Sequence, residues 1–237
     1  MAFAQMQSAD SLFRHANELY KQGNYAAAED TYRKIAESGY HSAELYYNLG
    51  NTAYKQNRLI DAVYYFEKAL KLNPNFGAAK DNLTFVRRGL QSGTEKLPEV
   101  FYKKIWKKFV RLFSSDTWAV LSLIVLFLIA GFILLFVFSS SPKYKKIAFY
   151  TLPALLFLWF VFLFSAYSAY QNENKKYGII IQKQVELFNE PTLDSKVENK
   201  GVGGEKVELL EEDEFWSKVK FPDGKTYWIT RDSYKKL

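Results

Sequence analysis

Two long apolar stretches constrain what this chain can fold into. No charged residue occurs between Thr117 and Pro142, and a second apolar run begins at Ile147. The core of the first run, about 21 residues, would form a helix of roughly 32 Å, enough to cross the hydrocarbon layer of a bilayer. A core helix of a soluble protein carries a polar face, and neither run has one. The sequence therefore predicts transmembrane helices over residues 117–139 and 147–170, with a buried soluble hairpin as the alternative.

The positive charge of the chain lies beside these runs. The formal net charge is +7, and ten cations flank the runs with no acid among them, so that without them the charge would be about −3. They are Lys103, Lys104, Lys107, Lys108 and Arg111 before the first run, Lys143, Lys145 and Lys146 between the runs, and Lys175 and Lys176 after the second. Cations at membrane flanks meet anionic headgroups. The pattern indicates anionic lipid as a partner, and no nucleic acid.

Two spans return the chain to the side on which it started. Because the connector Ser139–Lys146 is short, we expect a tight hairpin with both flanking regions in one compartment. A count of flanking cations places that compartment in the cytoplasm. The start Ala2-Phe3-Ala4 instead has the small-x-small form of a signal-peptidase site, which predicts a disordered signal-peptide remnant over residues 1–7 and a periplasmic location.

The segment 98–113 has the pattern of an interfacial helix. At helical spacing its five cations fall on one arc, and aromatic and aliphatic residues fill the opposite half. Such a helix lies in the headgroup plane; the alternative, a continuation of the soluble domain, would bury Trp106 and Phe109 in protein. Ser114-Ser115-Asp116 would then cap the first span. The expected membrane-interface residues are Lys103, Lys104, Trp106, Lys107, Lys108, Arg111 and Trp118.

The N-terminal region, residues 8–92, contains a 34-residue repeat. Its two copies are Ala9–Ser42 and Ala43–Phe76. The second copy reads Tyr46, Leu49, Gly50, Ala62, Phe66, Ala69, Pro74, which resembles the tetratricopeptide (TPR) repeat. Small residues at matching positions would let paired helices touch, and a helix over 77–90 would cap the second copy. The resemblance implies an all-α solenoid.

In TPR folds the first helix of each repeat lines a groove that binds protein segments. The matching positions are Phe13, Asn17, Tyr20, Tyr47, Asn51 and Tyr54, with Asp81, Phe85 and Arg88 in the capping helix. Asparagine and tyrosine recur at the same register and could hold a peptide amide and pack on its apolar groups. The alternative is that the tyrosines only pack within the solenoid.

Residues 178–237 show the period-2 alternation of short strands. We expect strands over Gly178–Phe188, Lys206–Leu210 and Phe215–Phe221, a flexible turn at Gly201–Gly204 and a hairpin at Asp223-Gly224. Several short strands in about 60 residues predict a small all-β barrel. The order of Val, Gly and Trp positions resembles a bacterial SH3-like (SH3b) domain. Trp216 and Trp228 would then be surface anchors for a peptide or glycan, or else would seal the barrel core.

The residues required for most catalytic and metal chemistry are missing. The chain has no cysteine and two histidines, and it contains no nucleophile elbow, metalloprotease helix or dinucleotide fingerprint. Four consecutive acids, Glu211–Glu214, fit a solvated hairpin better than a calcium site. We therefore expect no catalytic residues, no metal and no cofactor, and predict that the protein is not an enzyme.

The order of these segments describes a multi-domain membrane protein: TPR repeats, basic aromatic linker, two spans, SH3-like domain. It resembles the TPR-containing members of the Bacteroides aerotolerance (Bat) family. The resemblance implies an inner-membrane scaffold with periplasmic domains, acting beside von Willebrand A-type Bat membrane proteins and a MoxR-type AAA+ ATPase. The alternative is an envelope sensor or cell-wall-binding protein whose SH3-like domain engages peptidoglycan.

Overall fold

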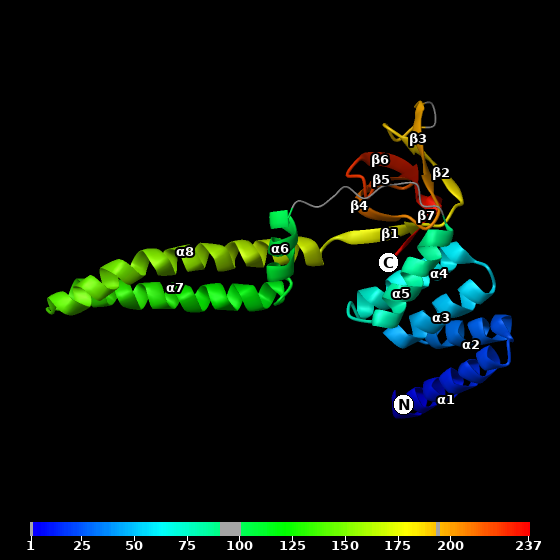
Figure 1. Ribbon diagram of the computed structural model, residues 1–237, viewed down its shortest axis with the longest axis horizontal. Helices are drawn as coiled ribbons and strands as arrows, with labels where there is room; N and C mark the ends of the chain where they lie inside the picture. Colours follow the sequence, from blue (N-terminus) through cyan, green and yellow to red (C-terminus); the bar gives the residue numbers. More distant parts are fainter. Residues whose placement is uncertain (1, 91–100, 193–194) are drawn as a thin grey trace. The chain divides into compact units, whose positions relative to one another are not determined.

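The computed structural model describes residues 2–90, 101–192 and 195–237, with side chains from residue 9 onward. The chain forms two compact units, one from residues 1–97 together with 176–237 and the other from residues 98–175. The first contains helices α1 to α5 and an antiparallel sheet, and the second contains helices α6 to α8 (Figure 1).

Five helices build the helical repeat region, and each packs on the next along the chain. They are α1 (Ala2–Lys21), α2 (Tyr25–Glu37), α3 (Ala43–Lys55), α4 (Leu59–Leu72) and α5 (Gly77–Gly89). Gly23 (φ 80°) and Asn57 (φ 59°) turn the chain between α1 and α2 and between α3 and α4. Both adopt the left-handed conformation that glycine and asparagine tolerate best. They lie 34 positions apart, so the two hairpins turn at the same register.

Small residues at matching positions let the helices touch. Ala16, Ala28 and Ala62 are completely buried. A Cβ atom at Gly50 would lie only 2.6 Å from the ring of Phe66, so the two helices α3 and α4 could not approach as closely with any larger residue. The side chain of Phe66 is itself 1% exposed and fills the gap. The structure therefore packs these helices as the repeat predicted, with small residues at the contact and Phe66 in the gap beside them.

Both ends of the repeat region differ slightly from the sequence prediction. Helix α5 covers the second hairpin through the buried Leu83 and Val86, as expected of a cap, although it ends at Gly89. The proposed remnant over 1–7 was expected to be disordered, but α1 already begins at Ala2. The segment Ala2–Lys21 contains neither glycine nor proline, and its Ala, Gln and Met residues favour helix. Residues 91 and 92 of the expected domain lie outside the described residues.

The sheet of the first unit has seven strands in the order β3-β2-β6-β5-β4-β1-β7, and all its pairings are antiparallel. The strands are β1 (Lys176–Ile180), β2 (Gln184–Phe188), β3 (Val197–Val202), β4 (Lys206–Glu212), β5 (Trp216–Lys220), β6 (Thr226–Thr230) and β7 (Tyr234–Lys236). Ile180, Val207, Val219 and Ile229 form the centre of its core. Among the described strands no pairing joins β3 to β7, so the sheet is open and does not close into the expected barrel.

Three strand predictions need correction. The expected single strand Gly178–Phe188 is two strands, β1 and β2, separated by Ile181-Gln182-Lys183. The alternation continues across this turn, which contains no glycine or proline to mark it. The edge strand β3 was missed because it is polar and mostly exposed. The supposed flexible turn at Gly201–Gly204 begins inside β3, and only its last two residues turn the chain.

The second unit is a long helical pair with a short helix at one end (Figure 1). Its helices are α6 (Phe101–Val110), α7 (Ser115–Phe138) and α8 (Pro142–Glu173). Helices α7 and α8 pack against each other and are both long and apolar enough to cross a membrane. Large side chains such as Phe127, Phe138 and Phe157 are more than 70% exposed in the absence of lipid. By length and composition the unit is consistent with a membrane hairpin.

The helices of this unit begin and end differently from the expectation. The connector between α7 and α8 is only Ser139-Ser140-Ser141, because Pro142 starts α8 in the first-turn position where a missing N–H costs least. Lys143, Lys145 and Lys146 therefore lie in the first turns of α8. The Ser114 hydroxyl accepts a hydrogen bond from the Thr117 backbone N–H, which makes Ser114 the N-cap of α7. Residues 98–100 of the expected interfacial helix lie outside the described residues.

Candidate functional site

Four asparagines form two equivalent hydrogen-bonded pairs on α1, α3 and α5. The Asn48 side-chain amide donates to Asn17 Oδ1 at 3.0 Å, and the Asn82 amide donates to Asn51 Oδ1 at 2.7 Å. The two donors, like the two acceptors, lie 34 positions apart. We call the surface formed by these four residues the asparagine face. It links the first helices of successive hairpins.

In Asn17 and Asn51, the two asparagines expected in the groove, the side-chain oxygen and the side-chain NH2 group have different roles. The oxygens of Asn17 and Asn51 accept hydrogen bonds from within the repeat region, and Asn17 Oδ1 also accepts one from the Tyr32 hydroxyl at 2.5 Å. Within the described residues, no acceptor is recorded for either side-chain NH2 group. These two groups can therefore donate to a peptide carbonyl. Sequence reasoning missed Asn48 and Asn82, although their own 34-residue spacing was a usable signal.

The aromatic positions expected in the groove divide into packing and accessible groups. Phe13 packs edge-on against Tyr32, and Tyr20 packs edge-on against Tyr25. Tyr47 packs between two phenylalanine rings, with centroid distances of 5.9 and 5.0 Å, and accepts a hydrogen bond from Asn82. These three side chains are half-buried and stabilise the repeats.

An accessible apolar surface remains where α3 meets α5. Tyr54 and Phe85 form an edge-to-face pair with ring centroids 5.7 Å apart, and Phe85 is 61% exposed. Arg88, one turn further along α5, is exposed. Phe85 occupies the position that is asparagine in the first two repeats, 34 residues after Asn51. This pair supplies an apolar contact beside the hydrogen-bond donors of the asparagine face.

Burial raises the pKa of Tyr32, which lies next to the asparagine face. Tyr32 is 1% exposed, and burial raises its pKa from 10.0 to about 12. The neutral hydroxyl is thus maintained to high pH, and its proton stays in the hydrogen bond to Asn17. The geometry of the asparagine face is insensitive to pH in the neutral range.

The sheet docks on a different surface of the repeat region, along α4. Five residues of α4 at helical spacing face it, and we call them the docking stripe: Ile60, Val63, Tyr64, Glu67 and Lys71. The Tyr64 hydroxyl donates to the Lys236 carbonyl at 3.2 Å, and Lys71 Nζ donates to the Leu237 carbonyl at 2.7 Å. The asparagine face, on α1, α3 and α5, takes no part in these contacts.

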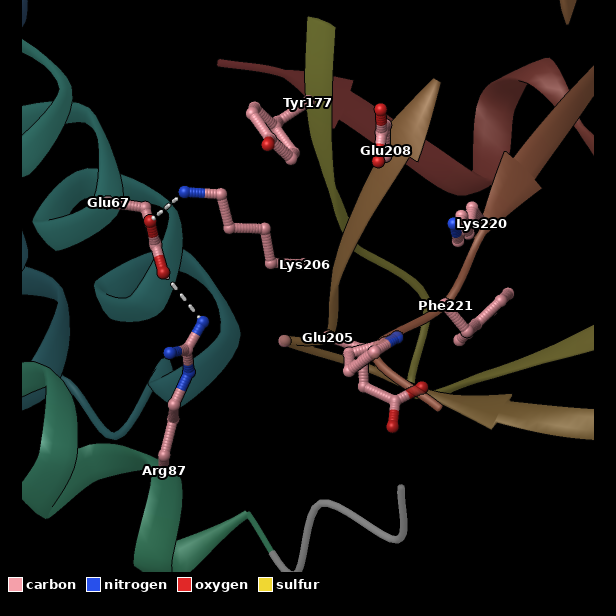
Figure 2. A pocket seen from close by; sticks show the side chains of 10 residues that line it. Glu67, Arg87, Tyr177, Glu205, Lys206, Glu208, Lys220 and Phe221 are labelled. Atoms are coloured by element: carbon pink, nitrogen blue, oxygen red, sulfur yellow. Dashed lines mark hydrogen bonds and ion pairs between the residues drawn. The ribbon is translucent and has the colours of Figure 1, made fainter. Parts of the chain in front are cut away.

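Glu67 is the buried charge at the centre of this contact. Its carboxylate accepts one hydrogen bond from Arg87 and one from Lys206 Nζ, each at 2.7 Å (Figure 2). The three side chains line a cavity of about 390 Å³ whose far side includes Tyr177, Glu208 and Lys220. Because the cavity contains cations and acids in paired positions, we interpret it as a structural ion-pair cluster.

Two glycines allow the sheet to approach the helices. A Cβ atom at Gly203 would lie 2.4 Å from Ile60 Cδ1 and 2.6 Å from the Gln182 carbonyl oxygen. One at Gly204 (φ 88°) would lie 2.8 Å from Leu90 Cδ1. Gly203 and Gly204, the part of the expected turn that does turn the chain, also allow close packing against Ile60 of α4 and against Leu90.

The basic residues of α6 and of the turn directly after it lie on the outside of the second unit. Lys103, Lys104, Lys107, Lys108 and Arg111 are all exposed. On the other side of α6, Trp106 packs against Phe164 of α8 (5.3 Å), and Phe109 packs against Trp118 of α7 (5.0 Å). Phe101, Tyr102 and Ile105 remain exposed, so the helix is bound to α7 and α8 by only part of its apolar surface.

Trp118 was expected to face lipid at the membrane interface, but it is buried. Only 2% of the residue is exposed, and its indole N–H donates to the Val110 carbonyl at 3.0 Å. It lies beneath α6, where it fixes the end of that helix. The reason is the sharp turn at Leu112–Ser114, which folds α6 back over the first turn of α7 and could not be read from helical periodicity.

The two tryptophans of the sheet are both half-buried. Trp216 packs edge-on against Phe188 at 5.3 Å, and Lys218 Nζ lies 5.6 Å from the ring centre of Trp228. The more accessible aromatic residue is the neighbouring Phe215, which is 70% exposed. In the acidic run, Glu211 pairs with Lys218, and Glu212 pairs with Lys236. Among the described residues, no cluster of three potential metal ligands occurs.

Comparison with known proteins identifies the class of the repeat region. Residues 13–75 match the family model of the tetratricopeptide repeat, a stretch that runs from within α1 to just beyond α4. The TPR interpretation of this part of the sequence is therefore confirmed. No curated protein matches the chain. The resemblances to SH3-like domains and to Bat proteins stay predictions.

Proposed function

We propose that the protein is a non-enzymatic, membrane-anchored adaptor that binds a segment of a partner protein along its asparagine face. TPR repeats suggest a role in protein–protein interaction, and the observation that carries the proposal is the repeated asparagine pair. In each pair the accepting asparagine, Asn17 or Asn51, uses its oxygen for the internal hydrogen bond, and its NH2 group has no acceptor among the described residues. A backbone carbonyl of an extended peptide could accept from each.

Apolar contact would complete the recognition. Tyr54 and the exposed Phe85 lie beside the asparagine pairs, and aromatic residues contribute strongly to binding energy at interfaces. Arg88 adds a positive charge at the same end of the surface. The partner segment would therefore be extended, with at least one large apolar side chain that packs on Phe85.

The anchoring role rests on α7 and α8, and the contact at α4 supports a two-pass topology. Residues 176–237 follow the second apolar helix, yet they pack on residues 60–71, which precede the first. This packing requires both regions to be on one side of a bilayer, as two spans would place them. We propose that the membrane is a bacterial inner membrane and that the side is periplasmic, in keeping with the Bat resemblance.

The same resemblance suggests the class of partner. A von Willebrand A-type Bat membrane protein, working with a MoxR-type AAA+ ATPase, would present the bound segment, in a complex linked to aerotolerance or envelope stress. Sheet surfaces near the exposed Phe215 would be free for a second contact. Anionic lipid at α6 would hold the adaptor against the membrane.

Isosteric substitutions test the adaptor proposal. Asn51→Asp and Asn17→Asp keep an oxygen for the internal hydrogen bond but remove the donating NH2 group. Asn75→Asp is the matched control, because Asn75 is exposed and lies outside the asparagine face. In affinity purification from detergent-solubilised membranes, the double variant should lose the proteins that the wild type and Asn75→Asp retain. Equal recovery with all three proteins would refute the proposal.

The alternative, binding to cell wall, draws on one feature of the sheet. A cavity of about 350 Å³ is lined by polar residues including Gln182, Gln184, Lys200 and Thr230, and Phe188 lies beside it. Such a surface could hold a sugar or a stem peptide. Co-sedimentation of the protein with purified sacculi, unchanged in the double asparagine variant, would favour this function over the adaptor.

A further inference from the structure

An apolar groove lies between α7 and α8 at the end of the pair that carries α6. Its volume is about 610 Å³, and its walls are almost entirely apolar. The residues that line these walls include Ala119, Phe160, Leu163, Phe164, Ala166 and Tyr170. Ser115 and Asp116, in the first turn of α7, also line it.

The apolar groove and the basic helix α6 are in contact through Phe164. Phe164 lines the groove, and its ring centroid lies 5.3 Å from that of Trp106 in α6. Trp106 is flanked along α6 by Lys103 and Lys107. Because Trp118 fixes α6 to α7 through the hydrogen bond to Val110, the cations are held at this end and are not on a free segment.

We propose that this groove binds one acyl chain of an anionic phospholipid whose phosphate is neutralised by the cations of α6. The inference rests on the proposed membrane location and adds a specific, retained lipid to it. Among the described residues at this end of the unit, the four exposed lysines of α6 and the exposed Arg111 just after it outnumber the acids Asp116 and Glu173. The carboxylate of Glu173 is moreover bound by Ser115, through its backbone N–H at 3.0 Å and its hydroxyl at 2.5 Å.

Charge and shape would distinguish this lipid from its neighbours in the bilayer. An acyl chain gains no hydrophobic free energy on leaving other lipid tails, so retention depends on packing in the groove and on the headgroup. Each Lys or Arg near the membrane surface adds to the attraction of an anionic lipid. Two such cations give a preference of at least about tenfold for an anionic over a zwitterionic headgroup.

The test uses the full chain in nanodiscs containing equal amounts of phosphatidylglycerol and phosphatidylcholine, released for native mass spectrometry. Ala119→Leu places extra side-chain atoms in the groove. Ala130→Leu makes the same change at an exposed position of α7 outside the groove. We expect the wild type and Ala130→Leu to retain one phosphatidylglycerol, and Ala119→Leu to lose it. Lys103→Gln with Lys107→Gln should retain lipid with a preference reduced at least about tenfold.

Retention that is equal in Ala119→Leu and Ala130→Leu, or equal for the two headgroups in the wild type, would overturn the inference. So would a change in self-association in Ala119→Leu with lipid retention unchanged, since the groove would then hold a helix. These results differ from failure of the proposed function, in which the wild-type chain would remain in solution without detergent and would not enter nanodiscs.

Discussion

Lys206 Nζ donates a hydrogen bond to Glu67 Oε2 at 2.7 Å across 139 positions of sequence. The ion pair joins β4 of the sheet to α4 of the TPR region. Both apolar helices lie between these two residues in the chain. A contact of such long range makes the first unit one folded body built from two distant parts of the sequence.

Removing the Glu67 charge should weaken this body. In Glu67→Gln, Arg87 and Lys206 would face each other without the carboxylate that neutralises them. Both cations are partly exposed, so we expect a loss of about 1–3 kcal/mol in the free energy of unfolding. Thermal unfolding of the detergent-solubilised full chain measures this. Glu37→Gln, the same change at an exposed residue of α2, should have little effect; an equal loss in both variants would contradict the assignment.

Adding a methyl group at Gly203 should separate the sheet from α4. The new Cβ atom would meet the backbone carbonyl of Gln182 as well as Ile60, and the carbonyl cannot rotate away as a side chain could. We expect Gly203→Ala to cost about 1–3 kcal/mol and to expose the sheet to limited proteolysis. Gly77→Ala, where no atom lies within 4 Å of the added Cβ, is the control. Unchanged cleavage of Gly203→Ala would show that the contact is not tight.

The buried Tyr32 should make the TPR region unstable at high pH. Burial raises its pKa to about 12 in the folded chain, above the value of 10.0 for an exposed tyrosine. The unfolded chain therefore loses the proton first as pH rises. The contribution to stability is complete below pH 10 and disappears as pH passes through about 12. Its full size is on the order of 2–3 kcal/mol.

Circular dichroism during thermal unfolding at pH 8 to 12 measures this dependence. Tyr32→Phe should start from a lower stability, because the hydrogen bond to Asn17 is lost, but it should decline less steeply above pH 10. Tyr40→Phe is the same substitution at a half-buried tyrosine packed against the same cluster. Identical slopes for the wild type and Tyr32→Phe would rule out Tyr32 as the titrating group.

Single cysteines can establish the topology, because the native chain has none. Lys34→Cys in α2, Ser140→Cys between α7 and α8, and Lys225→Cys in the β5–β6 turn are all at exposed positions. With a membrane-impermeant thiol reagent, the first and third should label from the same side and Ser140→Cys from the other. Labelling of Lys34→Cys and Lys225→Cys in intact spheroplasts would support the periplasmic side. Opposite labelling of those two positions would disprove the two-pass hairpin.

The sequence predicted local features of the fold well because they depend on periodicity. The 34-residue register located the helical hairpins of the repeats, and the uncharged runs located α7 and α8. The packing of Gly50 against Phe66 could be predicted because the repeat pattern indicates which two helices are in contact. The short turn between β1 and β2 and the polar strand β3 carried no such signal.

Contacts between distant segments could not be predicted in the same way. Ile60 and Val63 resemble any core residues of an amphipathic helix, and nothing local indicates that a sheet covers them. Asn17 and Asn51 were predicted to line a peptide-binding groove, which stays a prediction. The amides that donate to their oxygens come from the first helix of the next hairpin and were not foreseen. Trp118 was predicted at the membrane interface from its position at the start of the first apolar run, whereas the fold of α6 over it determines its burial.

The docking stripe also sets an order of events during biosynthesis. Ile60 and Val63 leave the ribosome long before residues 203–237, and both apolar helices are translated in between. The apolar residues of the docking stripe, Ile60 and Val63, therefore stay exposed on the newly made TPR region until both apolar helices have been inserted and the sheet has been translated and folded. Such delayed, long-range closure exposes a chain to aggregation. Expression of residues 1–97 by themselves would leave that stripe permanently open to water.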